Sequence, residues 1–347
     1  MWKKILMGIF ITLSAMVGFG AAKVQVEFNH SMNQISRDYD TQLRNVDLSG
    51  IKVNSDNDIV NILVIGNDAR KDRGYENDRG LTDTMIIATM DLKHNMLKTA
   101  SLMRDNYVEI PGHGHNKLNA AYSFGGIELL YKTIATNFDI KLDGYVEIGL
   151  SAFVDIVDAV DGVEVEVTQS EAEYLNSTNY IRKKQYRNVK VGKQTLNGHQ
   201  ALGYCRIRKK GTTVNGLRDD YGRTWRQRTV MKAVFSKVKS LPMPDWVKIA
   251  NKLLKHVKTD LDNDQILQYI TSVVTMGTTE IHQLQVPLEG YYRSAFNGEV
   301  SVGSCLMMTD GTSSTYTTRT NADALNKFVF KYDGKDHFKY GTFESKD

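Results

Sequence analysis

The 347-residue sequence contains little cysteine and little proline. Its two cysteines, Cys205 and Cys305, cannot form a disulfide framework; they allow one disulfide in an exported protein, but two partly buried, unpaired thiols are the simpler expectation. No CxxC pair or histidine-rich spacing is present, which disfavours a structural zinc site. With only four prolines and no low-complexity tract, long disordered regions are not expected.

The sequence also has no large excess of positive or negative charge. Charged residues make up 24% of the chain and the formal net charge is +4, far from the dense basicity of a nucleic-acid-binding domain. We therefore expect no nucleic-acid partner. Hydrophobic residues make up 41%, enough to fill the core of one large domain or of one domain with a small appendage.

Several widespread catalytic signatures are absent. The sequence has no Walker A pattern, no GxGxxG after a strand, no GxSxG turn and no HExxH. These absences disfavour a nucleotide-using kinase, a dinucleotide-dependent oxidoreductase and a zinc protease.

The N-terminus has the pattern of a membrane anchor. Lys3 and Lys4 precede a stretch from Ile5 to Ala22 that contains no charge. As a helix this stretch is about 27 Å long, just enough to cross a thin hydrocarbon core. A cleaved signal peptide is disfavoured by the weak cleavage site at 18–22, and a buried core helix by the lack of a polar face. We expect residues 1–22 to form a single-pass anchor in the cell membrane, with a cytoplasmic N-terminus and the bulk of the chain extracytoplasmic.

Beyond the anchor, the pattern predicts a stalk at 23–57, a catalytic domain at 58–289 and a C-terminal extension or completion of the core at 290–347. Helical and strand patterns alternate, which favours an α/β fold, an α-β-α layered domain with a mixed central sheet. Strands are expected at 59–66, 84–91, 96–102, 144–148 and 163–167. Helices are expected at 119–138 (interrupted at Gly125-Gly126), 150–160, 223–239 and 321–331, with a short helix after 196 and a loop or lid at 168–190.

Carboxylates and arginines gather beside the predicted strands, where α/β folds build their sites. Asp68 follows the first strand and Asp83 precedes the second, whereas Arg206 and Arg208 are expected on one side of an extended segment. Carboxylates suit Mg²⁺, and guanidinium groups bind phosphate oxygens in a bidentate manner. Any one of these residues is more often a turn, a cap or a surface ion pair, so the prediction of a pyrophosphate site rests on the ensemble.

In order and spacing, a series of motifs resembles the LytR-CpsA-Psr family across about residues 58 to 240. The matching segments are 61–70 (NILVIGNDAR), 82–85 (TDTM), 101–105 (SLMRD), 116–122 (NKLNAAY), 157–165 (VDAVDGVEV), 196–202 (LNGHQAL), 206–208 (RIR) and 222–228 (GRTWRQR). The resemblance implies a membrane-anchored enzyme of a Gram-positive type of envelope. It would transfer teichoic acid, capsule or a similar glycopolymer from undecaprenyl pyrophosphate to peptidoglycan.

The resemblance also implies roles for particular residues. The metal carboxylates would be Asp68 and Asp83, holding Mg²⁺ or, as an alternative, Mn²⁺. The pyrophosphate would be bound by Arg79, Arg104, Lys117, Arg206, Arg208, Arg223 and Gln227. The residues expected at the reacting atoms are Arg104, Asp105, Arg206 and Arg208.

This sequence departs from the family pattern at Leu81, where an arginine usually stands, and Arg79 is the candidate substitute. The loop between Arg208 and Arg223 is also longer than is typical of the family. Two alternatives remain open at this point: a polyprenyl-pyrophosphate hydrolase with the same residues, and a non-catalytic lipid-binding regulator of the envelope.

Overall fold

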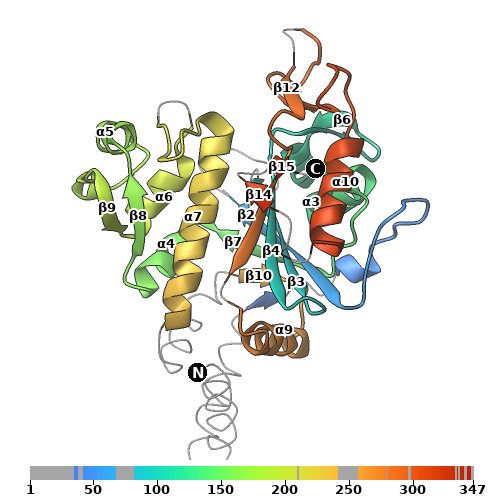
Figure 1. The fold of residues 1–347 in the computed structure, drawn as a ribbon, viewed down its shortest axis with the longest axis horizontal. Coiled ribbons are helices and arrows are strands. Elements are labelled where there is room, and N and C mark those ends of the chain that lie inside the picture. The colour runs from blue at the N-terminus through green and yellow to red at the C-terminus, as the bar shows by residue number, and fades with distance from the viewer. Residues whose placement is uncertain are drawn as a thin grey trace, which may run out of the picture. The chain divides into compact units, whose positions relative to one another are not determined.

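The computed structural model describes residues 35–37, 42–67, 82–208, 211–240, 257–278, 280–295, 298–332, 334, 337–339 and 342–344 (Figure 1). Two compact units are present. The described part of unit 1 falls within 37–147 and 258–347, and that of unit 2 within 35–36 and 148–257. No helix in these described ranges is long and apolar enough to cross a membrane. The predicted anchor at 1–22 lies outside them.

Unit 1 is built on a seven-stranded sheet in the order β1-β10-β7-β2-β3-β4-β11. The strands are β1 (Ser36–Arg37), β2 (Ile59–Asn67), β3 (Thr82–Asp91), β4 (Met96–Leu102), β7 (Gly144–Gly149), β10 (Val257–Thr259) and β11 (Ile281–Val286). The pairs β2–β3 and β3–β4 are antiparallel, whereas β4 and β11 are parallel. The predicted mixed central sheet is therefore confirmed, whereas the α-β-α order of the layers stays a prediction.

Helix α3 (Leu118–Phe138) covers part of this sheet's apolar surface. Leu130, Ile134 and Phe138 are fully buried at i, i+4 and i+8, the spacing of one helical face. The predicted interruption is present: Gly125 is non-helical and Gly126 has a φ of 67°, in the region that favours glycine.

The C-terminal region completes the core of unit 1. Helix α10 (Arg319–Phe330) buries Leu325 and Phe328 in the same cluster of side chains as α3. It is also joined to the sheet through a buried cation, because the Lys98 ammonium donates to Asp91 Oδ2 at 2.6 Å and to the Val329 carbonyl at 3.0 Å. Helix α10 therefore contributes side chains to the core of unit 1.

Residues 42–53, which were expected in a stalk, belong to unit 1 and pack on its core. Leu43 in the 3₁₀ turn η1 (Leu43–Asn45) is buried, and its N–H donates to Asp260 Oδ2 at 2.8 Å. Unit 1 also contains β5 (Tyr107–Ile110), β6 (Gly114–Lys117), α9 (Asn263–Thr275), β12 (Tyr292–Ser294), β13 (Leu306–Met308), β14 (His337–Lys339) and β15 (Thr342–Glu344).

Unit 2 is a helical layer packed on a two-stranded ribbon. It contains α4 (Leu150–Ala159), β8 (Val163–Val167), α5 (Gln169–Ser177), η3 (Lys184–Tyr186), β9 (Gly192–Leu196), α6 (Gly198–Arg206) and α7 (Asp219–Ser240). Strand β8 alternates buried valines with exposed glutamates, so one face of the ribbon supplies apolar side chains. Its core includes Leu175 from α5, Tyr204 from α6 and Val230 from α7.

Two local predictions in unit 2 were wrong. The segment 168–190 is not only a loop, because it begins with α5, where Thr168 and Glu171 form a reciprocal capping box and Leu175 is buried. Arg206 and Arg208 do not share an extended strand: Arg206 is the last residue of α6, and Ile207 caps that helix. Cys205 and Cys305 are both free thiols, and both are buried rather than partly buried.

Candidate functional site

In unit 1, the loop after β4 brings three of the predicted residues together. Asp105 Oδ2 lies 3.4 Å from Arg104 Nε, and its Oδ1 lies 3.8 Å from the Nζ of Lys117, the last residue of β6. The Asp105 side chain is 12% exposed, and those of Arg104 and Lys117 are 17% and 26% exposed. Two cations thus lie beside one carboxylate where water is partly excluded, which strengthens their electrostatic effect.

This loop is held by hydrogen bonds to several elements. The Met103 N–H donates to the Val286 carbonyl in β11 at 2.9 Å, and the Leu306 N–H of β13 donates to the Asp105 carbonyl at 2.8 Å. At the start of α3, the Asn119 N–H donates to the Arg104 carbonyl at 3.2 Å. Arg104 and Asp105 are therefore fixed by the sheet, by β13 and by α3 together.

The predicted metal carboxylates are only partly within the described residues. Asp83 lies in β3, directly after Thr82, whose register partner is Asn67 at the end of β2. Asp68 is the next residue along the chain from Asn67, but it lies outside the described residues, as do Arg79 and Leu81. Among the described side chains, no group of three metal-ligating residues occurs. The Mg²⁺ assignment and the role of Arg79 stay predictions.

In unit 2, Arg206 is placed by α6. The helix begins at a capping box in which Asn197 and Gln200 each accept a hydrogen bond from the other's N–H, and it ends at Arg206. A cation at this end is favoured by the helix dipole. The Arg206 guanidinium carbon lies 6.0 Å from the centre of the Tyr180 ring, a cation–π distance.

Helix α7 carries the other predicted binders. Arg223 and Gln227 are four residues apart and lie on the same face of the helix. Arg223 is 5% exposed and Gln227 is partly buried. Arg228 is also buried, and burial lowers its guanidinium pKa to about 10, which leaves it charged at neutral pH.

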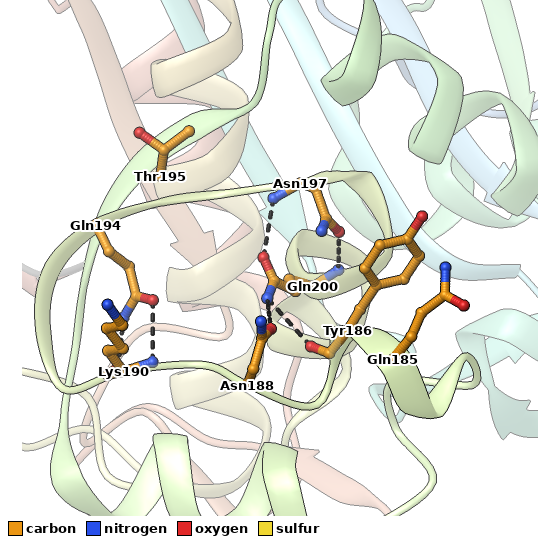
Figure 2. Close-up of a pocket in the computed structure, with 8 residues that line it drawn as sticks. All are labelled: Gln185, Tyr186, Asn188, Lys190, Gln194, Thr195, Asn197 and Gln200. Atoms are coloured by element: carbon orange, nitrogen blue, oxygen red, sulfur yellow. Dashed lines mark hydrogen bonds between the residues drawn. The ribbon is translucent and has the colours of Figure 1, made fainter.

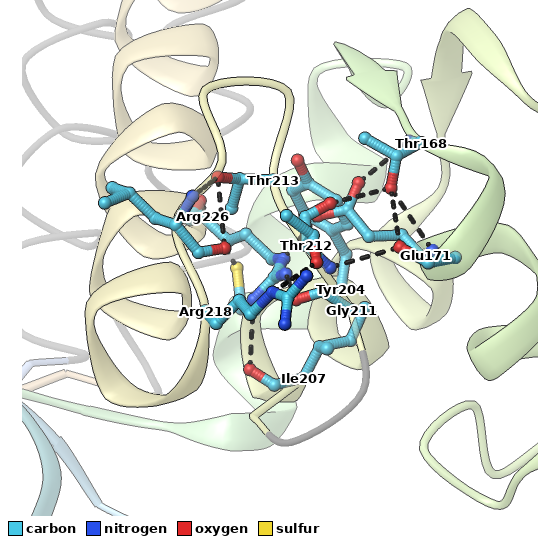
Figure 3. A network of polar contacts seen from close by, with 12 residues as sticks. Thr168, Glu171, Tyr204, Ile207, Gly211, Thr212, Thr213, Arg218 and Arg226 are labelled. Atoms are coloured by element: carbon cyan, nitrogen blue, oxygen red, sulfur yellow. Dashed lines mark hydrogen bonds and ion pairs between the residues drawn. The ribbon is translucent and has the colours of Figure 1, made fainter.

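A residue that the sequence analysis did not single out, Arg226, organises this part of unit 2 (Figure 3). Its side chain is fully buried. Its Nε donates to Glu171 Oε1 at 2.6 Å, its Nη1 to the Ile207 carbonyl at 3.2 Å and its Nη2 to the Gly211 carbonyl at 2.6 Å. One guanidinium therefore joins α7 and α5 to the segment that carries Arg206 and follows it.

Glycine is required where this network is tight. A Cβ on Gly211 would lie 2.7 Å from Ile207 Cγ2 and 3.1 Å from both Arg226 Nη2 and Glu171 Cγ. The chain can approach the guanidinium this closely only without a side chain. Neither the burial of Arg226 nor this contact could be read from one sequence, although the Thr168-to-Glu171 spacing of a capping box was visible.

The candidate residues thus form two groups, each within one unit. Unit 1 holds Arg104, Asp105 and Lys117 around one loop. Unit 2 holds the α6 end with Arg206, the following Arg208, and the α7 face with Arg223 and Gln227.

Comparison with known proteins identifies the family. The LytR_cpsA_psr family model matches residues 22–318. The chain is 32% identical over 271 residues to the polyisoprenyl-teichoic acid–peptidoglycan teichoic acid transferase TagU of Bacillus cereus (strain AH820), covering 77% of this chain and 82% of the relative. It is 28% identical over 305 residues to TagT of Bacillus subtilis (strain 168), covering 85% and 90%.

A solved structure agrees with this assignment. The crystal structure of protein gbs0355 from Streptococcus agalactiae matches with a TM-score of 0.63 and 26% identity, covering 80% of this chain and 90% of that one. Because the family model spans most of the chain, this protein belongs to the LytR_cpsA_psr family, as its motifs predicted.

Proposed function

We propose that this protein is a phosphotransferase that moves an anionic glycopolymer, such as teichoic acid or capsule, from an undecaprenyl-pyrophosphate carrier to peptidoglycan. The names of TagU and TagT describe transfer of teichoic acid from a polyisoprenyl carrier to peptidoglycan. The observation that carries the proposal is the fixed loop in which Arg104 and Lys117 flank Asp105. Cations held in this way suit an anion whose charge increases during the reaction.

The proposed reaction is a displacement at phosphorus. A sugar hydroxyl of peptidoglycan attacks the phosphorus that bears the glycan and releases its proton to water, and the bond from that phosphorus to the bridging oxygen breaks. Polyprenyl phosphate leaves with the electron pair. Such transfers depend mainly on positioning and on neutralising the leaving group, and arginines do this with bidentate hydrogen bonds. We assign that role to Arg104, Arg206, Arg208 and Arg223, and we assign Asp105 the orientation of the attacking hydroxyl.

Magnesium is part of the proposal, with Mn²⁺ as the alternative. The support is the family membership and the matching motifs, in which Asp68 and Asp83 are the expected carboxylates. They follow Asn67 and Thr82, a register pair of the antiparallel strands β2 and β3. Mg²⁺ is commonly held by one or two carboxylates together with substrate phosphates. When bound, it would withdraw charge from the pyrophosphate oxygens.

We also propose that the protein acts at the outer face of the cell membrane. The support is the uncharged stretch from Ile5 to Ala22 behind two lysines. A substrate that carries its own pyrophosphate fits a compartment without ATP.

The test is a transfer reaction with the full chain. The reaction contains undecaprenyl-pyrophosphate-linked glycan, peptidoglycan and Mg²⁺, and it measures polyprenyl phosphate and wall-bound glycan. Loss of a charge-stabilising group commonly lowers a rate by roughly 100-fold or more, so Arg206→Ala and Asp83→Ala should each lower transfer by that order. Arg44→Ala, at an exposed arginine of unit 1, is the control and should transfer normally. Normal transfer by both site variants would show that the site is assigned wrongly.

A further inference from the structure

Unit 2 contains a polar cavity of about 650 Å³ that the proposed transfer reaction does not use (Figure 2). Its walls come from the segment around η3, from β9 and from the start of α6. The residues that line it are Gln185, Tyr186, Asn188, Lys190, Gln194, Thr195, Asn197 and Gln200. A smaller cavity of about 200 Å³ shares Thr195, Asn197 and Gln200 with it and adds Asp158, Asp161 and Gly162. The two cavities therefore share part of their walls.

The walls of the cavity are held in place by internal hydrogen bonds. The Gln200 amide nitrogen donates to the Tyr186 carbonyl at 3.1 Å and to Asn188 Oδ1 at 2.9 Å. Gln200 and Asn197 also form the capping box of α6. The Tyr186 ring stacks on His199 with 5.2 Å between ring centres. These bonds hold the walls of the cavity in place, and a site with fixed walls loses less entropy when a ligand binds.

Several polar groups of the cavity remain available to a ligand. Within the described part of the chain, the Nδ2 atoms of Asn188 and Asn197, the Thr195 hydroxyl and the Gln185 amide make no hydrogen bond to protein atoms. Gln185, Asn188 and Thr195 are exposed. The cavity therefore offers uncharged donors and acceptors on a rigid frame.

This chemistry selects for sugar residues rather than for a phosphate polymer. Amide and hydroxyl groups bind the hydroxyl and acetamido groups of a glycan, whereas phosphate sites use arginine. Among the described residues no arginine lines either cavity; Lys190 lines the larger cavity, and Asp158 and Asp161 line the smaller one. A volume of about 650 Å³ falls within the range of small-ligand sites.

We propose that this cavity binds an uncharged, N-acetylated segment of the acceptor glycan strand. That the cavity serves as an acceptor subsite rests on the proposed function. That it binds a glycan does not depend on the proposed function. The probe is N-acetylchitotetraose, a neutral β-1,4-linked N-acetylglucosamine oligomer, added to the full chain and followed by saturation-transfer NMR and calorimetry.

The variants are chosen so that the fold is kept. Asn188→Asp preserves the oxygen that accepts from Gln200 and replaces only the available NH₂ group, and Thr195→Val removes a hydroxyl from a strand position that suits a β-branched residue. Asn45→Asp makes the same chemical change at an exposed asparagine of unit 1 and serves as the control. Chitotetraose should bind the unaltered chain and the control equally, and should bind each cavity variant at least fivefold more weakly.

The glycan assignment would be overturned if chitotetraose bound all the proteins equally or bound none of them. It would also be overturned if a glycerol-phosphate oligomer bound more tightly than chitotetraose and Asn188→Asp weakened that binding. A second measurement separates this proposal from the proposed function. In the transfer reaction, Asn188→Asp should raise the KM for peptidoglycan at least fivefold and leave the KM for the lipid substrate unchanged. Chitotetraose binding without any transfer would refute the proposed function alone. Transfer with an unchanged peptidoglycan KM would refute the acceptor subsite.

Discussion

Replacing Arg226 by methionine tests whether a buried ion pair holds the arginine-bearing segments of unit 2. The side chains of Arg226 and Glu171 are both fully buried, and Arg226 also donates to the carbonyls of Ile207 and Gly211. Removing one partner of a buried pair leaves the other charge uncompensated, which typically costs about 3–5 kcal/mol. We expect Arg226→Met to lower the free energy of unfolding by about this amount, measured by denaturant titration of the full chain.

A second substitution separates stability from positioning. Replacing both partners with apolar side chains of similar size is often neutral or stabilising. The double variant Glu171→Leu/Arg226→Met should therefore recover the part of the loss that comes from the uncompensated Glu171 charge. It does not recover the hydrogen bond from Thr168 N–H to Glu171 Oε2 or those from Arg226 to the Ile207 and Gly211 carbonyls, each worth about 1 kcal/mol.

Transfer activity should not recover in the same way. The double variant still lacks the donors to the Ile207 and Gly211 carbonyls, so the segment after Arg206 loses its attachment to α7. We expect a stable protein whose transfer rate stays at least tenfold below normal. A double variant with normal stability and normal transfer would refute the positioning role of Arg226. A single variant with unchanged stability would refute the buried-pair argument itself.

Three further predictions concern the fold. Burial raises the pKa of Asp91, but the hydrogen bonds from Lys98 and a neighbouring histidine outweigh it and hold that pKa below its usual value. The Asp91–Lys98 ion pair should therefore stabilise the fold at neutral pH and lose this contribution as pH falls below about 4. Asp91→Asn should lower the free energy of unfolding at pH 7 by about 3–5 kcal/mol and should weaken its dependence on pH in the acid range. Denaturant titrations from pH 3 to 7 measure both effects, and a pH dependence of stability equal to that of the unaltered protein would contradict the prediction. Gly198→Ala should lower the melting temperature, because a Cβ at this position would lie 2.3 Å from the Val154 carbonyl oxygen. Such overpacking costs about 1–3 kcal/mol. An unchanged melting curve would contradict the close packing of α4 and α6. Burial raises the pKa of the Cys205 thiol to about 12, so a thiol reagent at pH 8 should label it only after unfolding, and rapid labelling of the native protein would contradict its burial.

The sheet and most helices could be predicted because the spacing of apolar residues within each segment indicates which side chains are buried. The mostly apolar run of β2 and the period-2 alternation of β8 each indicate a strand. Helix α5 was not predicted because it is mostly polar and buries only a few side chains. Its N-terminus was nevertheless marked by Thr168 and Glu171.

The candidate site was predictable in residue type but not in organisation. The three α7 arginines Arg223, Arg226 and Arg228 look alike in the sequence, and only the packing of α5 and of the segment after α6 makes Arg226 the one that bonds Glu171. Arg206 was assigned to an extended segment because apolar and charged residues alternate around it, whereas the capping box at Asn197 extends a helix to that point. Burial that depends on distant segments cannot be read from local spacing.

The most direct test of the proposed function is to follow the phosphorus atom that bears the glycan. The full chain is incubated with Mg²⁺, peptidoglycan and undecaprenyl-pyrophosphate-linked glycan labelled with radioactive phosphorus at that atom. Transfer predicts that the label becomes covalently attached to peptidoglycan while unlabelled polyprenyl phosphate is released, and that Arg206→Ala prevents both. Label recovered only as soluble glycan phosphate would show hydrolysis, and label that stays on the lipid in the unaltered protein would show binding without catalysis; either result would contradict the transferase assignment.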